Sequence, residues 1–426
     1  MKFLTDKKTL KTCHIYRMLA KNAKKPHLSM HTPGHKIGKF DLTELSFSDN
    51  LANPNGCILE AERDIAKVLG ADRSFILTDG STSGVYAMLH AAKSLGVKNI
   101  AVPAFSHQSV FRACEILGIK CVLLGDSAVK VLPEKTEILS AIKKCDALLI
   151  TSPTYYGEIA PLEEYKTALG EKLLLVDGAH GGHLHYDKTR YAGVHADIWV
   201  DGVHKSLPAF TQGAVVSAKG EKNAIALEGS VAYFRTTSPS YPIMASVEYA
   251  VKYPRNIRLE TEVLDFIENY AKYVFFGGDW TKLCIAFSDP KSVYAYLEKK
   301  GVYAEFYDDT FVCFYLSPAT KLAQFRKVKK LILAKKKLLL ELDENVQNGV
   351  KRLPAPLKTG KNGVEYVELD ESAGRVCAMD CGLFPPCTPL VLKGETIEKE
   401  KAETLKNAVG TFGLKDGKIA VYKMED

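Results

Sequence analysis

The sequence predicts an α/β protein in which a mainly parallel sheet is wrapped by helices and followed by a smaller α+β unit. From Phe75 to Gly202, apolar runs of roughly four to six residues alternate with helical patterns of about ten, which is the rhythm of parallel strands joined by crossover helices. The chain of 426 residues is too long for one small core, which indicates a second unit. In such a sheet, functional loops lie at the carboxyl ends of the strands.

The elements follow in order from the N-terminus. Residues up to about position 29 form a predicted amphipathic arm, because apolar residues are spaced for one helical face at Leu10, Ile15, Met18 and Leu19. A helical pattern after Gly56 then leads into the sheet. Strands are predicted at FILT, NIAVPA, KCVLLG, DALLITS, KLLLVDG and DIWVDG, with helices at VYAMLHAAKSLG, SVFRACEILG, EILSAIKKC and PLEEYKTALG.

A polar stretch from Tyr253 to Glu262 marks the change to the second unit and precedes a predicted long helix. A small open-faced α+β sandwich is expected from KLCIAF, KSVYAYLEKKG, VYAEFYDD, TFVCFYLSP and a helix over Lys321–Leu342. Leu353–Gly363 is predicted to be a linker, and the tail around LFPPCTPLVL to be rich in strands. The expected domains are an arm (1–29), a large domain (30–260), a small domain (261–352) and a tail subdomain (353–426).

The composition excludes several classes of partner. The net charge of +7 is modest for this length and spread along the chain, so no nucleic-acid partner is predicted. The N-terminal apolar run is too short for a signal peptide or a membrane span, so we expect a cytoplasmic protein with no membrane partner. Ten cysteines are scattered singly from Cys13 to Cys387 without zinc spacing, which predicts reduced thiols and no metal.

Reactive side chains gather at the predicted strand ends. All eleven histidines lie at or before His204, and the predicted α+β sandwich that follows has none. DGSTSG lacks a P-loop lysine and G-x-G-x-x-G is absent, so neither a nucleoside triphosphate nor a dinucleotide is favoured. The four strand-end segments are DGSTSG over Asp79–Gly84, AFSHQS with His107, LLLVDGAHGGH with Asp177, and VDGVHKSLPA with His204 and Lys205.

Each segment alone has an ordinary structural explanation, namely a helix cap for DGSTSG and for Asp177, a loop residue for His107, and a cation at a helix start for Lys205. Together they offer an anion cradle at a helix N-terminus, an aromatic ring, a buried carboxylate and a lysine. Pyridoxal phosphate needs a lysine for its imine, an acid facing its ring nitrogen, a flat partner for its face and a helix end for its phosphate. The combination therefore predicts a pyridoxal-phosphate enzyme.

Seven collinear motifs resemble one family, the fold-type-I pyridoxal-phosphate decarboxylases of ornithine, lysine and arginine. The motifs are HTPGHK, DGSTSG, SPTYYG, VDGAHGGH, HKSLPAFTQGA, RTTSPSYPIMAS and FPPCTP, and the likeness runs from about Met30 to Glu395. The resemblance implies an aminotransferase-like domain with a mainly parallel seven-stranded sheet and a small α+β C-terminal domain. It also implies the short form of the family, without the N-terminal receiver-like domain of the large inducible enzymes.

The resemblance also implies roles for single residues. Lys205 would carry the cofactor as a Schiff base, Asp177 would pair with the pyridinium nitrogen, and His107 would stack on one face of the ring. His204 would lie beside the reacting carbon. The remaining cofactor-binding residues implied are Ser81, Thr82 and Ser83 for the phosphate, Ala179 on the other ring face, His180, and Ser238. Because the TTSPSY segment of one subunit approaches its neighbour's cofactor in the family, a homodimer with a shared active site, or a higher oligomer, is expected.

The sequence departs from the family pattern at four positions. Gly202 and Val203 stand where serine and threonine are common, so a phosphate-contacting hydroxyl is missing. Gly178 replaces a frequent acidic residue, and Cys387 replaces a small residue in the tail motif. The expected reaction remains decarboxylation of arginine, lysine or ornithine to its amine and CO2 for polyamine metabolism, with arginine slightly favoured.

Two other functions remain open. An aminotransferase or another pyridoxal-phosphate lyase would share the same cradle, and Arg352 or Arg375 is available to clamp a substrate carboxylate. An inactive cofactor-binding scaffold is the other alternative, suggested by Gly202 and Val203.

Overall fold

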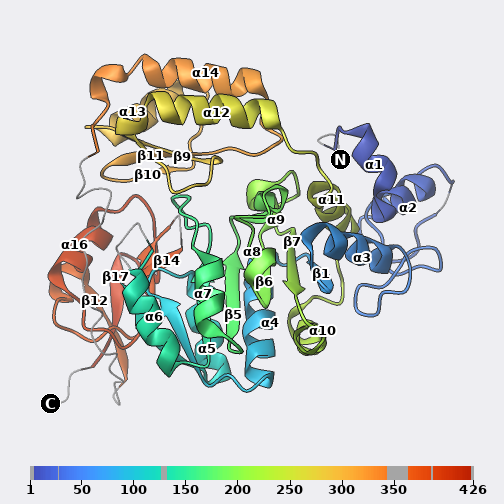
Figure 1. Cartoon of the computed structure of the whole chain (residues 1–426), viewed down its shortest axis with the longest axis horizontal. Helices are drawn as coiled ribbons and strands as arrows, with labels where there is room; N and C mark the ends of the chain where they lie inside the picture. The colour runs from blue at the N-terminus through green and yellow to red at the C-terminus, as the bar shows by residue number, and fades with distance from the viewer. Residues whose placement is uncertain (1–3, 27, 126–131, 343–362, 385–386, 424–426) are drawn as a thin grey trace. The chain divides into compact units, whose positions relative to one another are not determined.

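The computed structural model describes residues 4–26, 28–125, 132–342, 363–384 and 387–423 (Figure 1). The chain divides into two compact units, the first made of residues 1–97 and 151–347 and the second of residues 98–150 and 348–426. The predicted linker over Leu353–Gly363 lies, apart from Gly363, outside the described residues. The domain boundaries expected from the sequence therefore stay a prediction.

A seven-stranded, mostly parallel sheet confirms the predicted fold class. The strand order is β1-β7-β6-β5-β4-β2-β3, with β7 antiparallel to both β1 and β6. Parallel pairing joins β5 to β6 in the first unit, and β2 to β3 and to β4. The strands are β1 (Arg73–Leu77), β2 (Asn99–Pro103), β3 (Lys120–Leu124), β4 (Ala147–Thr151), β5 (Leu173–Gly178), β6 (Ile198–Asp201) and β7 (Ala214–Ala218).

Strand β7 was not assigned from the sequence. Its five residues, AVVSA, are all buried and lie between Gly213 and Gly220. A short apolar run bounded by glycines is a usable strand signal. Its antiparallel direction depends on pairing with β1 and β6, which no local pattern encodes.

Helices of the first unit pack against its strands, and α4 begins just after the end of β1. Helix α4 begins at Gly80, so DGSTSG forms its cap and first turn. This position agrees with the helix N-terminus that the sequence indicated for DGSTSG. Gly84 allows close packing of α4, because a Cβ there would lie 2.8 Å from Leu77 and 2.9 Å from Val200. The helices are α3 (Cys57–Leu69), α4 (Gly80–Ser94), α7 (Leu162–Leu169), α8 (Ala192–His195), α9 (Val203–Ser206), α10 (Glu221–Phe234) and α11 (Tyr241–Val251), with the 3-10 turn η1 (Gly182–Tyr186).

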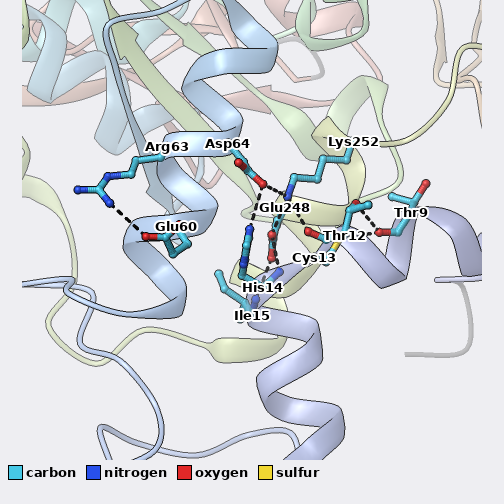
Figure 2. A network of polar contacts seen from close by, with 10 residues as sticks. All are labelled: Thr9, Thr12, Cys13, His14, Ile15, Glu60, Arg63, Asp64, Glu248 and Lys252. Carbon is cyan, nitrogen blue, oxygen red and sulfur yellow. Dashed lines mark hydrogen bonds and ion pairs between the residues drawn. The ribbon is translucent and has the colours of Figure 1, made fainter.

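The N-terminal arm consists of two helices, α1 (Lys7–Thr12) and α2 (His14–Asn22), rather than one continuous amphipathic helix. The break lies beside Glu248, a fully buried residue of α11 (Figure 2). Its carboxylate accepts hydrogen bonds from the backbone N–H groups of His14 (2.6 Å) and Ile15 (2.9 Å), which satisfies the first turn of α2.

A lysine neutralises this acidic cluster. Lys252 Nζ lies 3.0 Å from Glu248 Oε1 and 2.7 Å from Asp64 Oδ2, and His14 Nε2 lies 3.0 Å from the same Asp64 oxygen (Figure 2). His14, Asp64 and Glu248 have the donor set of a metal site. Because the ammonium of Lys252 already bonds both carboxylates, the cluster is a structural clamp between the arm, α3 and α11.

The first unit also contains the small α+β layer. Its sheet has the order β10-β11-β9-β8, and α12, α13 and α14 pack together on one side of it (Figure 1). Helix α14 ends at Leu333, nine residues before the predicted end at Leu342. The elements are β8 (Val274–Phe275), β9 (Lys282–Ala286), β10 (Phe306–Tyr307), β11 (Phe311–Tyr315), α12 (Ile257–Asn269), α13 (Pro290–Lys299), α14 (Leu322–Leu333), η2 (Ala271–Tyr273) and η3 (Lys336–Leu338).

The second unit combines the β2 to β4 region with a strand-rich tail, as predicted for the tail. The tail forms two three-stranded sheets, β12-β17-β16 and β14-β13-β15. None of the described helices is both long enough and apolar enough to cross a membrane. The elements are α5 (Gln108–Leu117), α6 (Lys135–Lys144), β12 (Val364–Glu368), η4 (Leu369–Glu371), β13 (Cys381–Leu383), β14 (Thr388–Val391), α16 (Lys399–Asn407), β15 (Thr411–Phe412), β16 (Leu414–Lys415) and β17 (Lys418–Tyr422).

Candidate active site

Asp177 and Lys205 lie at the carboxyl ends of two neighbouring parallel strands. Asp177 is in β5 opposite Val200 of β6, and Lys205 follows β6 in the short helix α9. Asp177 is 2% exposed, and Ala179 N–H donates to its Oδ1 at 3.1 Å. Burial raises the pKa of the Asp177 carboxyl, while the charge of Lys205 and the Ala179 N–H oppose the shift. The predicted carboxylate and lysine are therefore within electrostatic reach of each other.

The His180 side chain lies beside the lysine. Its Nε2 lies 3.4 Å from Lys205 Nζ. Two tyrosine rings meet the His180 ring edge-on, Tyr155 with centroids 4.7 Å apart and Tyr315 with centroids 5.7 Å apart. We did not predict either tyrosine as a site residue. The SPTYYG motif was a signal for Tyr155, whereas Tyr315 comes from β11 and is brought here only by the tertiary fold.

His204 is held in one orientation beside Lys205. Its Nδ1 lies 2.9 Å from the Gly213 carbonyl, to which its backbone N–H also donates at 3.0 Å. Burial lowers the pKa of His204 and the charge of Lys205 adds to the effect, while the Gly213 hydrogen bond opposes it. The ring is therefore neutral at pH 7, with the proton on Nδ1 and the lone pair on Nε2.

Ser81 has the features of a phosphate ligand. Its side-chain oxygen is buried at the first turn of the fifteen-residue helix α4, and no described atom forms a hydrogen bond with it. A helix N-terminus with an unsatisfied hydroxyl suits an anion, so the residues fit the phosphate of the cofactor. Ser83 donates instead to the Gly80 carbonyl at 3.0 Å, and Thr82 is exposed, so neither of these two predicted ligands shares the arrangement of Ser81.

Close packing explains the glycine at position 202. A Cβ on Gly202 would lie 2.3 Å from the Ala179 carbonyl oxygen and 2.7 Å from Ser81 Oγ. The serine common in the family therefore does not fit this backbone. The same contacts bring Ser81, Ala179 and the segment before Lys205 together within the first unit.

The two remaining predicted residues, Ser238 and His107, are described by their own contacts. Ser238 is exposed, and its N–H donates to Thr236 Oγ1 at 3.2 Å; Thr236 N–H in turn donates to Asp79, the cap of α4, at 3.1 Å. His107 belongs to the second unit, where it caps α5 by accepting from Ser109 N–H at 3.2 Å. The stacking role of His107 and the inter-subunit role of Ser238 stay predictions.

Of the two arginines weighed for an aminotransferase, only Arg375 is among the described residues. Arg375 donates to Glu365 and, at 3.0 Å, to the Tyr422 carbonyl, so it is committed to the tail sheet. Arg352 lies outside the described residues.

The sheet topology together with a buried carboxylate facing a lysine at adjacent strand ends defines the class, a fold-type-I pyridoxal-phosphate enzyme. The profile of the Orn/Lys/Arg decarboxylase major domain matches residues 39–275, more than half of the chain, and that of the C-terminal domain matches residues 343–407. The chain belongs to the Orn/Lys/Arg decarboxylase family, a family of pyridoxal-phosphate-dependent carboxy-lyases.

Individual relatives agree with this placement. The uncharacterized protein YaaO of Bacillus subtilis is 29% identical over 97% of this chain and 99% of its own length. The arginine decarboxylase of Bacillus cereus is 29% identical over 60% of each chain. Among solved structures, the lysine decarboxylase of Francisella novicida has a TM-score of 0.75 at 18% identity, covering 97% of this chain and 81% of that one. The serine palmitoyltransferase of Sphingomonas wittichii has a TM-score of 0.55 at 12% identity, covering 77% and 84% respectively, which shows the shared fold alone.

Proposed function

We propose that this chain decarboxylates a basic amino acid, namely arginine, lysine or ornithine, to the corresponding amine and CO2, with pyridoxal phosphate held by Lys205. The observation that carries the proposal is the buried Asp177 carboxylate within the field of Lys205. An isolated buried carboxylate is costly, and a cationic partner offsets that cost. The named arginine and lysine decarboxylases among the relatives support the substrate class.

Bound pyridoxal phosphate supplies an electron-withdrawing ring that accepts the electrons released as CO2 leaves. Asp177 would keep the ring nitrogen protonated, because its buried negative charge favours a cation beside it. The Ser81 hydroxyl and the N-terminus of α4 would hold the phosphate. His107 and Ala179 would bracket the ring faces.

His204 is suited to return a proton to the substrate carbon. Its Nδ1 is committed to the Gly213 carbonyl, which leaves Nε2 as the atom that takes up and delivers a proton. The amino group of Lys205 would be the second candidate for this proton transfer. The polyamine role, a cytoplasmic location and a homodimer completed by Ser238 of the partner subunit belong to the same proposal.

The test is to incubate the purified protein and pyridoxal phosphate separately with L-arginine, L-lysine and L-ornithine. Released CO2 is measured, and the amine is identified by chromatography. We expect CO2 and amine in equal amounts, with arginine the best substrate. Transfer of the amino group to a 2-oxo acid without CO2 release would show an aminotransferase instead, and Lys205→Ala is the control for a background reaction.

A further inference from the structure

The buried charged pair of Lys282 and Asp279 contacts Tyr315, which packs on His180 beside Lys205. The proposed chemistry assigns this pair no role. Lys282, the first residue of β9, and Asp279 are each 1% exposed. Lys282 Nζ lies 3.8 Å from Asp279 Oδ2 and 3.3 Å from the Thr281 hydroxyl. Burial lowers the pKa of Lys282, and the charge of Asp279 opposes that shift. A buried ion pair seldom adds stability over apolar residues of similar volume, so stability alone does not explain it.

Asp279 remains an anion in this setting. Its Oδ1 accepts from the Thr281 N–H at 2.8 Å and the Thr281 hydroxyl at 2.7 Å, and it lies 2.9 Å from His183 Nε2. Burial acts to raise the pKa of Asp279, but the charges of His183 and Lys282 outweigh burial and hold the pKa below its usual range. Lys282 therefore keeps a charged partner at neutral pH.

The pair is packed against the SPTYYG turn that carries Tyr155. The aliphatic stem of Lys282 lies against Gly157, where a Cβ would be 2.6 Å from Lys282 Cβ. Asp279 N–H donates to the Gly157 carbonyl at 3.1 Å. The turn is thus packed against the backbone of Asp279 and the stem of Lys282.

The charge of Lys282 also fixes Tyr315. Its ammonium lies 4.2 Å from the centre of the Tyr315 ring, a cation–π contact strengthened by burial. The Tyr315 hydroxyl donates to the backbone carbonyl of Tyr155 at 2.7 Å, and the two rings are in contact with centroids 5.7 Å apart. Both rings meet His180 edge-on, and His180 Nε2 lies 3.4 Å from Lys205 Nζ.

We propose that Lys282 is a positioning residue of the decarboxylation site: paired with Asp279, it holds the two tyrosines so that His180 stays within reach of Lys205. This inference rests on the proposed function. With His180 Nε2 3.4 Å from Lys205 Nζ, a proton on the lysine can be shared with the imidazole, so loss of this contact should make Lys205 easier to deprotonate. Among the described residues, Asp177 and His204 are further ionisable groups that interact with the charge of Lys205.

The test measures Lys205 itself in protein freed of pyridoxal phosphate. Acetic anhydride labels neutral lysines, and mass spectrometry of the Lys205 peptide across pH gives the midpoint at which it becomes reactive. The variant is Asp279→Asn/Lys282→Met, which removes one charge of each sign, so a shift cannot come from a change in net charge. Asparagine keeps the oxygen that accepts from Thr281. The control is Lys335→Met, whose ammonium lies 4.4 Å from the Tyr296 ring, away from this cluster.

We expect the double variant to lower the Lys205 midpoint by at least about half a pH unit and to lower kcat at least about fivefold, with KM changed less than about twofold. The Lys335→Met protein should match the unmodified protein. A double variant that matches the control in midpoint and kcat would overturn the positioning role and leave the decarboxylase proposal standing. A shifted midpoint in a protein that releases no CO2 from any basic amino acid would support the positioning of Lys205 and refute the decarboxylase. If the double variant unfolds, Tyr315→Leu leaves the ion pair in place and removes the ring that joins Lys282 to His180 and Tyr155, and the same two outcomes apply to it.

Discussion

Restoring the serine that the family commonly has at position 202 should weaken this protein. In Gly202→Ser, the new Cβ would lie 2.3 Å from the Ala179 carbonyl oxygen and 2.7 Å from Ser81 Oγ, both closer than side-chain carbons normally approach other atoms. Overpacking of a dense interior costs about 1–3 kcal/mol, and a clash with backbone that cannot rotate away falls at the upper end of that range.

The clash also displaces the hydroxyl that would bind phosphate. A hydrogen bond to a charged group contributes about 1.5–3 kcal/mol, which corresponds to a Kd for pyridoxal phosphate roughly 10- to 150-fold weaker if the Ser81 contact is lost. Comparing Gly202→Ala with Gly202→Ser separates the effect of the carbon from that of the added hydroxyl.

Fluorescence titration of the cofactor-free protein with pyridoxal phosphate gives the Kd, and calorimetry gives the unfolding temperature. The matched control is Gly229→Ser in helix α10, where a Cβ meets nothing within 4 Å. The reasoning is refuted if Gly202→Ser binds the cofactor as tightly as the control and unfolds at the same temperature. That result would mean that the backbone of Ala179 moves aside at little cost.

Three further predictions concern single residues of the first unit. Lys205→Ala should lose its cofactor absorbance band and lower turnover by more than about a thousandfold, measured as CO2 release. Burial raises the pKa of Asp201 to about 7, although hydrogen bonds from Tyr191 and Trp199 oppose the shift, so the folded state binds this proton more tightly than the unfolded chain. The free energy of unfolding should therefore fall by roughly 4 kcal/mol as the pH rises from 3.8 to 7. Asp201→Asn should flatten this part of the curve of stability against pH. Arg235→Met leaves Glu62 buried without its partner at 2.9 Å and should cost about 3–5 kcal/mol in denaturant unfolding, whereas an unchanged midpoint would contradict that pairing.

The sequence was sufficient to place Asp177 and Lys205, because both depend on local periodicity. An apolar strand that ends in a polar residue puts that residue at the sheet edge whatever the rest of the chain does. The residues that we missed depend on contacts distant in sequence. Tyr315 reaches His180 only because β11 belongs to the same unit, and the break in the N-terminal arm depends on Glu248, 234 positions beyond His14.

The two glycines near Lys205 that depart from the family pattern both lie in tightly packed backbone. Gly178 and Gly202 lie at the ends of β5 and β6, where Gly178 is paired with Asp201. A Cβ on Gly178 would lie 2.9 Å from the Val200 carbonyl oxygen and 3.2 Å from Asp201 Oδ1, just as a Cβ on Gly202 would meet the Ala179 carbonyl oxygen. The backbone approaches so closely at positions 178 and 202 that a Cβ atom fits at neither of them. An acidic residue at 178 and a serine at 202 would each require the segments that follow β5 and β6 to move apart, which accounts structurally for both glycines.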